Sequence, residues 1–179
     1  DVEGREYLDL LAGIAVNVLG HAHPALGAAV SEQAAKLIHG SNFFTTRPQI
    51  ELAERLVAAS GGDGDTRVFF CNSGAEANEA ALKLARLHGH RKQVARPQIL
   101  VMDNGFHGRT LATLSATGNP AKQRGFEPLM PGFVRVPYDD IAAVHHAAAQ
   151  HGDIVAVLIE PVQGEGGIRL ASPDYLRQL

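Results

Sequence analysis

The chain lacks several features whose presence would define its class. It has one cysteine in 179 residues, so no internal disulfide can form, and a reducing compartment such as the cytoplasm is expected. Its formal net charge is −3 and it contains no run rich in lysine and arginine, which provides no basic field for nucleic acid. It has no uninterrupted apolar stretch long enough to span a bilayer. We therefore expect neither a nucleic-acid-binding protein nor a membrane protein.

A metal site is also not expected, although nine histidines are present. His21 and His23 lie two residues apart before a proline, and His145 and His146 are adjacent. None of the nine shows the i,i+4 pairing with a nearby third ligand that a zinc site requires.

The composition indicates an ordinary globular chain, with 45% hydrophobic and 20% charged residues. Its length suits one domain with a substantial core rather than two large ones. The chain starts at Asp1 without methionine, inside the strand-like pattern 6–11, and it stops at Leu179 inside a helix that begins near Ser172. We therefore expect a fragment of a longer protein.

Short apolar strands alternate with amphipathic helices along most of the chain. This alternation predicts an α/β fold, with a doubly wound and mostly parallel sheet that carries helices on both faces. The strands are expected at 67–71, 98–102, 133–136 and 154–159, and the helices at 24–40, from 48, at 75–88 and at 139–150. The inward face of helix 75–88 is expected to consist of Ala77, Ala80, Ala81, Leu84 and Leu87.

The stretch from residue 68 to 79 is the most informative one, because an apolar run that predicts a buried strand is followed directly by a helical pattern there. Unpaired amides and the peptide dipole at a helix N-terminus favour an anion, and Ser73, Gly74 and Ala75 suit a phosphate group. The alternative is a plain capping box, Ser73-x-x-Glu76, which explains the same residues without a ligand.

Two further polar loops follow predicted strands, at 104–110 and 160–167. Loops that leave the carboxyl ends of parallel strands converge on one crevice, where ligands bind in open sheets. For the same reason, the Gly- and Thr-rich run 105–131 is expected to be a functional loop rather than a linker.

These segments together resemble the class III (acetylornithine-type) aminotransferases of fold type I. The matching segments are Ser-Gly-Ala-Glu-Ala-Asn-Glu at 73–79, Phe-His-Gly-Arg-Thr at 106–110, Glu-Pro-Val-Gln-Gly-Glu-Gly-Gly at 160–167, the signature at 13–24, and Ser-Asn-Phe-Phe at 41–44. The motifs occur in the family's order and span nearly the whole chain. Pyridoxal 5'-phosphate is the cofactor that the resemblance implies.

The resemblance also implies roles for single residues. Phe106 would stack on the pyridine ring beside His107, Arg109 would grip the substrate carboxylate, and Glu165 would act as a gate. Each has an alternative: a core aromatic for Phe106, a plain loop histidine for His107, a solvated charge for Arg109 and an exposed loop acid for Glu165. Glu160 is expected to support the site rather than to act on the substrate.

The implied activity is transfer of the δ-amino group of N-acetylornithine to 2-oxoglutarate, in arginine biosynthesis. Ornithine, succinylornithine and 4-aminobutyrate are alternative donors. The family resemblance further implies a homodimer, with residues 1–40 belonging to the small domain and residues 41–179 forming part of the large one. The lysine that would form the Schiff base is expected beyond Leu179, because the lysines present do not stand in a matching context: Lys36, Lys83, Lys92 and Lys122. The fragment alone is therefore expected to be inactive.

Two hypotheses of other classes remain. A dinucleotide-binding oxidoreductase would need G-x-G-x-x-G after its first strand, which Ser73-Gly74-Ala75-Glu76 does not supply. The other is a non-catalytic truncated module that packs against a partner.

Overall fold

The computed structural model describes all residues from Asp1 to Leu179. The chain divides into two compact units, Asp1–Val68 and Phe69–Leu179, and each is described by itself. The domain boundary expected after residue 40 stays a prediction.

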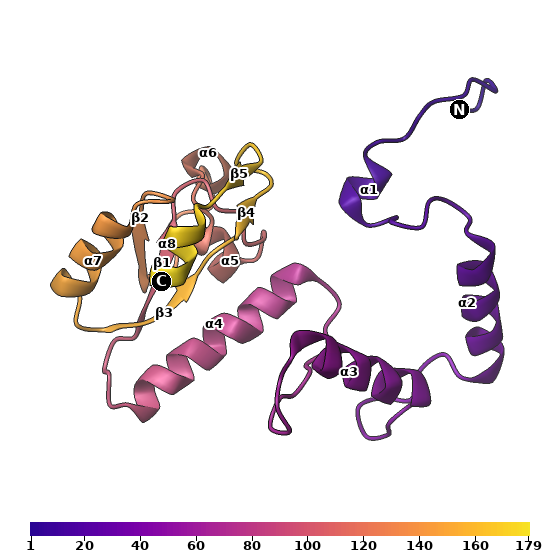
Figure 1. The fold of residues 1–179 in the computed structure, drawn as a ribbon, viewed down its shortest axis with the longest axis horizontal. Coiled ribbons are helices and arrows are strands. Elements are labelled where there is room, and N and C mark those ends of the chain that lie inside the picture. Colours follow the sequence, from indigo (N-terminus) through magenta and orange to yellow (C-terminus); the bar gives the residue numbers. More distant parts are fainter. The chain divides into compact units, whose positions relative to one another are not determined.

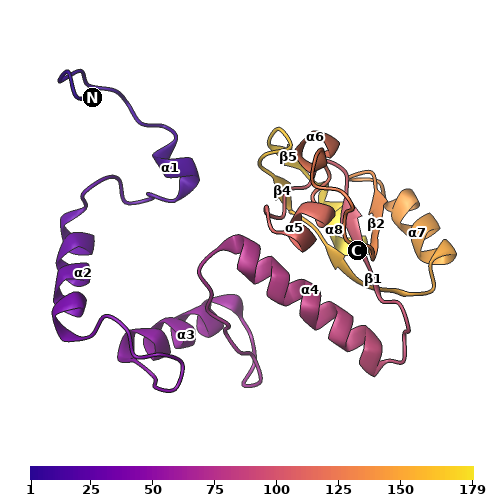
Figure 2. The same cartoon turned by 180° about the vertical axis from the view of Figure 1, so that it is seen from behind.

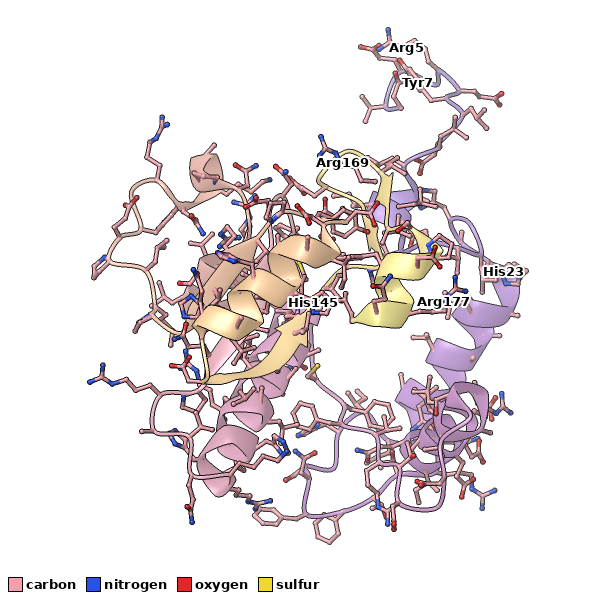
Figure 3. All side chains as sticks on the ribbon, turned by 60° about the vertical axis from the view of Figure 1, so that its left-hand side comes forward. Arg5, Tyr7, His23, His145, Arg169 and Arg177 are labelled. Carbon is pink, nitrogen blue, oxygen red and sulfur yellow. The ribbon has the colours of Figure 1, made fainter.

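The first unit consists of helices joined by loops, and none of its residues is buried. Its helices are α1 (Ala12–Ala15), α2 (Pro24–Lys36) and α3 (Arg47–Ser60). The two longer helices carry proline in their first turn, where its missing N–H costs nothing, and this confirms the helices predicted from 24 and 48. The strand expected at 6–11 does not form. Instead, Arg5 and Tyr7 both donate to the Asp1 carboxylate, and Figure 3 shows these two side chains together at the N-terminus.

The second unit is built on a parallel sheet with strand order β2-β1-β3 (Figure 1). The strands are β1 (Gln98–Met102), β2 (Phe133–Val136) and β3 (Ile154–Leu158), and they confirm three of the four predicted ones. A two-stranded antiparallel hairpin, β4 (Val162–Gln163) with β5 (Arg169–Leu170), follows. The helices are α4 (Gly74–Arg91), α5 (Leu111–Ala116), α6 (Pro120–Gln123), α7 (Ile141–Gln150) and α8 (Pro173–Gln178).

The central strand β1 divides the core into two layers, because successive side chains of a strand point to opposite faces. Ile99 and Val101 pack against α4 and α5 on one face. Leu100 and Met102 pack against α7 and α8 on the other. All four side chains are at most 2% exposed. The predicted architecture, an α/β sheet covered on both faces, is confirmed.

The predicted strand 67–71 is wrong. This segment has no regular secondary structure and pairs with none of β1, β2 and β3. Without a hydrogen-bonded neighbour, the apolar run does not become buried. Phe69 is 71% exposed and Cys71 is exposed as well, contrary to the expected burial.

The predicted inward face of α4 is also wrong. Leu82 and Gly89 are the buried residues of this helix, whereas Leu84 is 65% and Leu87 is 47% exposed. One apolar stripe of α4 contains Leu82, and another contains Leu84 and Leu87. Both are apolar enough to pack, so the hydrophobic pattern alone selected the wrong stripe. The sheet takes the stripe that also places Asn78 toward the loop after β1.

The run 105–131, predicted as a loop, contains the short helices α5 and α6. In Figures 1 and 2, these two helices and the β4–β5 hairpin lie together at one end of the sheet. No helix of the chain is long and apolar enough to cross a membrane.

Candidate functional site

The loops after β1 and β3 are bound to each other by side-chain hydrogen bonds. The Glu160 carboxylate accepts the Phe106 N–H at 2.8 Å, across 54 residues of sequence. The Gln163 side chain, fully buried, donates to the Asp103 carbonyl at 2.7 Å. A hydrogen bond to a charged acceptor is stronger than one between neutral groups, so Glu160 fixes the backbone at the aromatic residue. The predicted convergence of these two loops is therefore observed.

The N-terminal turns of α4 meet the same loop from the other side. The Asn78 amide donates to the His107 carbonyl at 2.7 Å, and the Thr110 hydroxyl donates to Glu79. Gly108 has φ +134°, and a Cβ added there would lie 2.9 Å from the Cβ of Ala75. A side chain at Gly108 would thus be strained in its backbone and would push the two segments apart.

Ser73 is the N-cap of α4, because its hydroxyl oxygen accepts the Glu76 N–H at 3.2 Å. The Glu76 carboxylate reaches back to the Asn72 N–H at 2.7 Å. The capping role is thus present. It leaves the N–H groups of Gly74 and Ala75 without an acceptor, and a Cβ at Gly74 would meet nothing within 4 Å. These free amides at the positive end of an 18-residue helix are suited to an anion.

A cavity of about 220 Å³ lies beside Phe106. Its walls come from both loops and from the segment between α5 and α6, and its lining residues are Asn104, Gly105, Phe106, Thr117, Asn119, Lys122, Glu165, Gly166 and Gly167. Phe106 is therefore at a cavity wall rather than in either layer of the core.

His107 lies behind that wall, 4% exposed, with its Nε2 atom buried and without a hydrogen-bond partner. Its main chain is held on both sides, because its N–H donates to the Thr117 hydroxyl at 3.1 Å and its carbonyl accepts from Asn78. Burial, with a smaller contribution from the nearby Arg135 charge, lowers the pKa of His107 from 6.5 to about 4. The ring is neutral at neutral pH.

We expect the His107 ring in the complete protein to titrate with an apparent pKa of about 4. The measurement is a pH titration in which NMR monitors the ring carbon–proton pairs. Because the folded pKa is depressed, the stability this neutral ring contributes is present above about pH 6.5 and is lost as the pH falls toward 4. His107→Gln, which lacks the titrating ring, assigns the signal and removes this part of the pH dependence. An apparent pKa of 6 or above would contradict the burial argument.

Three charged side chains gather around the Phe106 ring. The Arg109 guanidinium carbon lies 5.8 Å and the Lys122 Nζ 5.7 Å from the ring centroid, both within the range of cation–π attraction. Lys122 forms an ion pair with Glu165. The hydrogen bond from Lys122 lowers the pKa of the Glu165 carboxyl, and the Arg109 charge adds to this, so Glu165 is ionised.

Of the residues singled out in the sequence, the structure gathers Phe106, Arg109 and Glu165 at the cavity and packs His107 behind Phe106. The N-terminus of α4 approaches this loop through Ala75 and Asn78, but Ser73, Gly74 and Ala75 do not line the cavity. Four neighbours were not assigned to the site from the pattern: Asn78, Thr117, Gly118 and Lys122. Asn78 and Thr117 form hydrogen bonds with the main chain of His107. No periodic pattern in the sequence indicates such contacts. The Gly118 carbonyl accepts the Asn104 N–H, and the Gly118 N–H donates to the Gly105 carbonyl. The Thr117-Gly118 pair within the predicted loop was the sequence feature that could have indicated this role.

The chain has no group of three or more histidine, cysteine, aspartate or glutamate side chains that could hold a metal ion. His145, labelled in Figure 3, is exposed on α7.

A helix N-terminus with free amides, an aromatic ring at a cavity wall and two basic side chains beside it are features that would suit a phosphorylated, planar ligand and an anionic partner. The family model of aminotransferase class-III matches residues 1–179, the whole chain. The chain belongs to this family of aminotransferases, and its fold is that of fold type I.

Among individual proteins, the chain is 55% identical to the acetylornithine aminotransferase of Nitrosomonas europaea, over all of the chain and 45% of that protein. It is 53% identical to the acetylornithine aminotransferase of Methanocaldococcus jannaschii, over 99% of the chain and 44% of that protein. The chain therefore spans less than half the length of these curated relatives.

Two solved structures place the fold among these enzymes. The ornithine aminotransferase from Toxoplasma gondii superposes with a TM-score of 0.91 at 33% identity, covering 99% of this chain and 42% of that one. The N-acetylornithine aminotransferase from Stenotrophomonas maltophilia gives a TM-score of 0.80 at 40% identity, covering 98% and 42%.

Proposed function

We propose that the complete protein containing this chain transfers the δ-amino group of N-acetylornithine to 2-oxoglutarate, in the cytoplasm and in arginine biosynthesis. The observation that carries the proposal is the placement of the α4 N-terminus against the Phe106 loop, with a cavity and two cationic side chains beside the ring. The identity to named acetylornithine aminotransferases supports the choice of donor.

The residues present fit pyridoxal 5'-phosphate. The unpaired amides of Gly74 and Ala75, with the Ser73 hydroxyl, would hold the phosphate, and Phe106 would lie against the ring beside the buried His107. When bound, this group supplies an electron sink for amino-group transfer. The chain's own contribution is to orient it: Glu160 and Asn78 fix the backbone on either side of Phe106 and His107.

Arg109 would bind the carboxylate of the substrate, because its guanidinium fork can make two parallel hydrogen bonds to that group. Glu165, which lines the cavity, would act as the gate between donor and acceptor. We also propose that the complete protein is a homodimer, that residues 1–40 belong to its small domain and residues 41–179 to its large domain, and that residues 1–179 alone do not turn over substrate.

The second candidate donor is ornithine itself, which the structural similarity to an ornithine aminotransferase supports. The two candidates differ in the α-amino group, which is acylated in one and charged in the other. Glu165 is the nearby carboxylate that could pair with a charged α-amino group, so its engagement with Lys122 favours the acylated donor.

The decisive experiment measures glutamate formed from 2-oxoglutarate by the complete protein with four donors: N-acetylornithine, ornithine, succinylornithine and 4-aminobutyrate. We expect kcat/KM for N-acetylornithine to exceed that for ornithine by about tenfold or more, since ornithine would place an unpaired charge in the site. Preference for ornithine would replace the proposed donor. No transfer from any donor, in a folded protein that contains the remaining half, would favour the non-catalytic module.

A further inference from the structure

Thr117 is polar and yet fully buried, at the C-terminal end of α5. Its hydroxyl oxygen accepts the N–H of His107 at 3.1 Å. The same hydroxyl donates to the Thr113 carbonyl at 2.9 Å, and the Gly108 carbonyl lies 3.4 Å from it. A hydroxyl group has one hydrogen and two lone pairs, so donation to Thr113 leaves a lone pair for His107. One buried side chain therefore satisfies a buried main-chain donor of the loop after β1.

This hydrogen bond is one of three that hold consecutive peptide groups of that loop. The peptide group before Phe106 donates to the Glu160 carboxylate at 2.8 Å. The next peptide group donates to Thr117, and the one after His107 accepts from the Asn78 amide at 2.7 Å. The three side chains come from the loop after β3, the end of α5 and helix α4. Because three successive peptide groups are fixed, the backbone dihedral angles of the two residues between them are fixed as well.

Thr117 differs from the other two side chains in its surroundings. It is 0% exposed, whereas Asn78 and Glu160 are half-buried. Water can replace a hydrogen bond that is lost near the surface, but it cannot reach the partner of a fully buried hydroxyl, so the loss costs more there. All donors and acceptors of these bonds belong to the unit Phe69–Leu179, and the contacts are complete within it.

We propose that Thr117 is a positioning residue for the ring of the cofactor: its hydroxyl sets the main chain between Phe106 and His107, and thereby the aromatic ring at the cavity wall. The inference rests on the proposed function, because that assigns Phe106 to the ring of pyridoxal phosphate. The phosphate group would be held by the amides of α4, which Thr117 does not contact. Loss of the Thr117 hydroxyl should therefore weaken binding of the ring and spare binding of the phosphate.

The test uses two probes and the complete protein stripped of cofactor. Pyridoxine 5'-phosphate has the ring and the phosphate but no aldehyde, so it cannot bond to a lysine, and inorganic phosphate supplies the anion alone. Thr117→Val, similar in shape but without the hydroxyl, is expected to raise the Kd of pyridoxine phosphate about tenfold and to leave that of phosphate within about twofold. Thr117→Ser keeps the hydroxyl and loses only the methyl group that restricts its rotation, so both Kd values should stay within about threefold. Calorimetry measures both.

Ser115→Ala is the matched control. It removes another buried hydroxyl of α5, which accepts the Met130 N–H at 2.8 Å and makes no hydrogen bond to the Phe106 loop. It is expected to lower the urea midpoint, as Thr117→Val does, but to change neither Kd. Hydrogen exchange of the amides 104–110, measured without any ligand, should become faster in Thr117→Val and stay unchanged in Ser115→Ala.

Three results would overturn the inference: an unchanged Kd of pyridoxine phosphate in Thr117→Val, an equal weakening of both probes, or the same loss in Ser115→Ala. Should Thr117→Val fail to fold, Asn78→Ala removes the hydrogen bond to the next peptide group of the loop. It should raise the Kd of pyridoxine phosphate about threefold or more. No effect in Asn78→Ala, or a loss in Thr117→Ser as large as that expected for Thr117→Val, contradicts the proposal.

The two proposals fail separately. Normal transfer from N-acetylornithine together with an affinity for pyridoxine phosphate that ignores Thr117 overturns only this inference. Binding of pyridoxine phosphate that depends on Thr117, in an enzyme that transfers no amino group, overturns only the proposed function. Binding of neither probe overturns both.

Discussion

Gly118→Ala is expected to destabilise the complete protein by about 3 kcal/mol or more, as overpacking against backbone does. A Cβ at Gly118 would lie 2.4 Å from both the Asn104 nitrogen and the Met102 carbonyl oxygen. Backbone atoms cannot rotate away as a side-chain tip can. The Gly118 N–H also donates to the Gly105 carbonyl at 2.7 Å, so the displaced segment includes the residues that precede Phe106.

Urea unfolding measures this effect, and the midpoint should fall without a change in the m-value. Gly152→Ala is the matched control in the same unit, because a Cβ there would meet nothing within 4 Å. Gly118→Ala should also weaken binding of pyridoxal phosphate, measured by equilibrium dialysis, since the loop at Phe106 must shift. A Gly118→Ala protein as stable as Gly152→Ala would show that the segment 102–105 is free to move.

The second large effect is expected at Arg109. Arg109→Leu should lower kcat/KM for the amino donor about a hundredfold, because losing one partner of a hydrogen-bonded charge pair costs about 2–5 kcal/mol, reduced here by the exposure of this side chain. Steady-state kinetics of the complete enzyme provides the measurement.

Arg109→Lys separates charge from geometry. It keeps the positive charge but not the planar fork, so we expect an intermediate loss of about tenfold. Arg124→Leu removes an exposed arginine of the same unit and should leave kcat/KM unchanged. Equal activity of Arg109→Leu and Arg124→Leu would return Arg109 to its alternative interpretation, a solvated surface charge.

The strands at the centre of the second unit could be predicted from sequence alone. Ile99, Leu100, Val101 and Met102 are uniformly apolar, and the structure places alternate members in opposite layers of the core. Such a run is buried on both faces wherever helices cover both sides of a sheet, so local composition is sufficient. The same reasoning failed for 67–71, because an apolar run becomes a strand only if another strand pairs with it.

Helix α4 shows a second limit of the sequence pattern. Leu84 and Leu87 are as apolar as Leu82, but only Leu82 packs on the sheet. Which stripe is buried depends on hydrogen bonds such as that from Asn78 to the loop at His107, and these form between residues 29 positions apart.

The order of motifs along the chain indicated the family and the fold, and it selected the segments proposed to form the site, because the residue types in each loop follow from the chemistry they would support. Only the tertiary structure decided which charges meet. Lys122 and Glu165 stand 43 residues apart and carry no shared pattern, yet α6 and the loop after β3 bring them to one cavity. Pairing between distant side chains depends on how the helices and strands pack. The ion pair between Glu165 and Lys122 is therefore seen in the tertiary structure and has no counterpart in the sequence pattern.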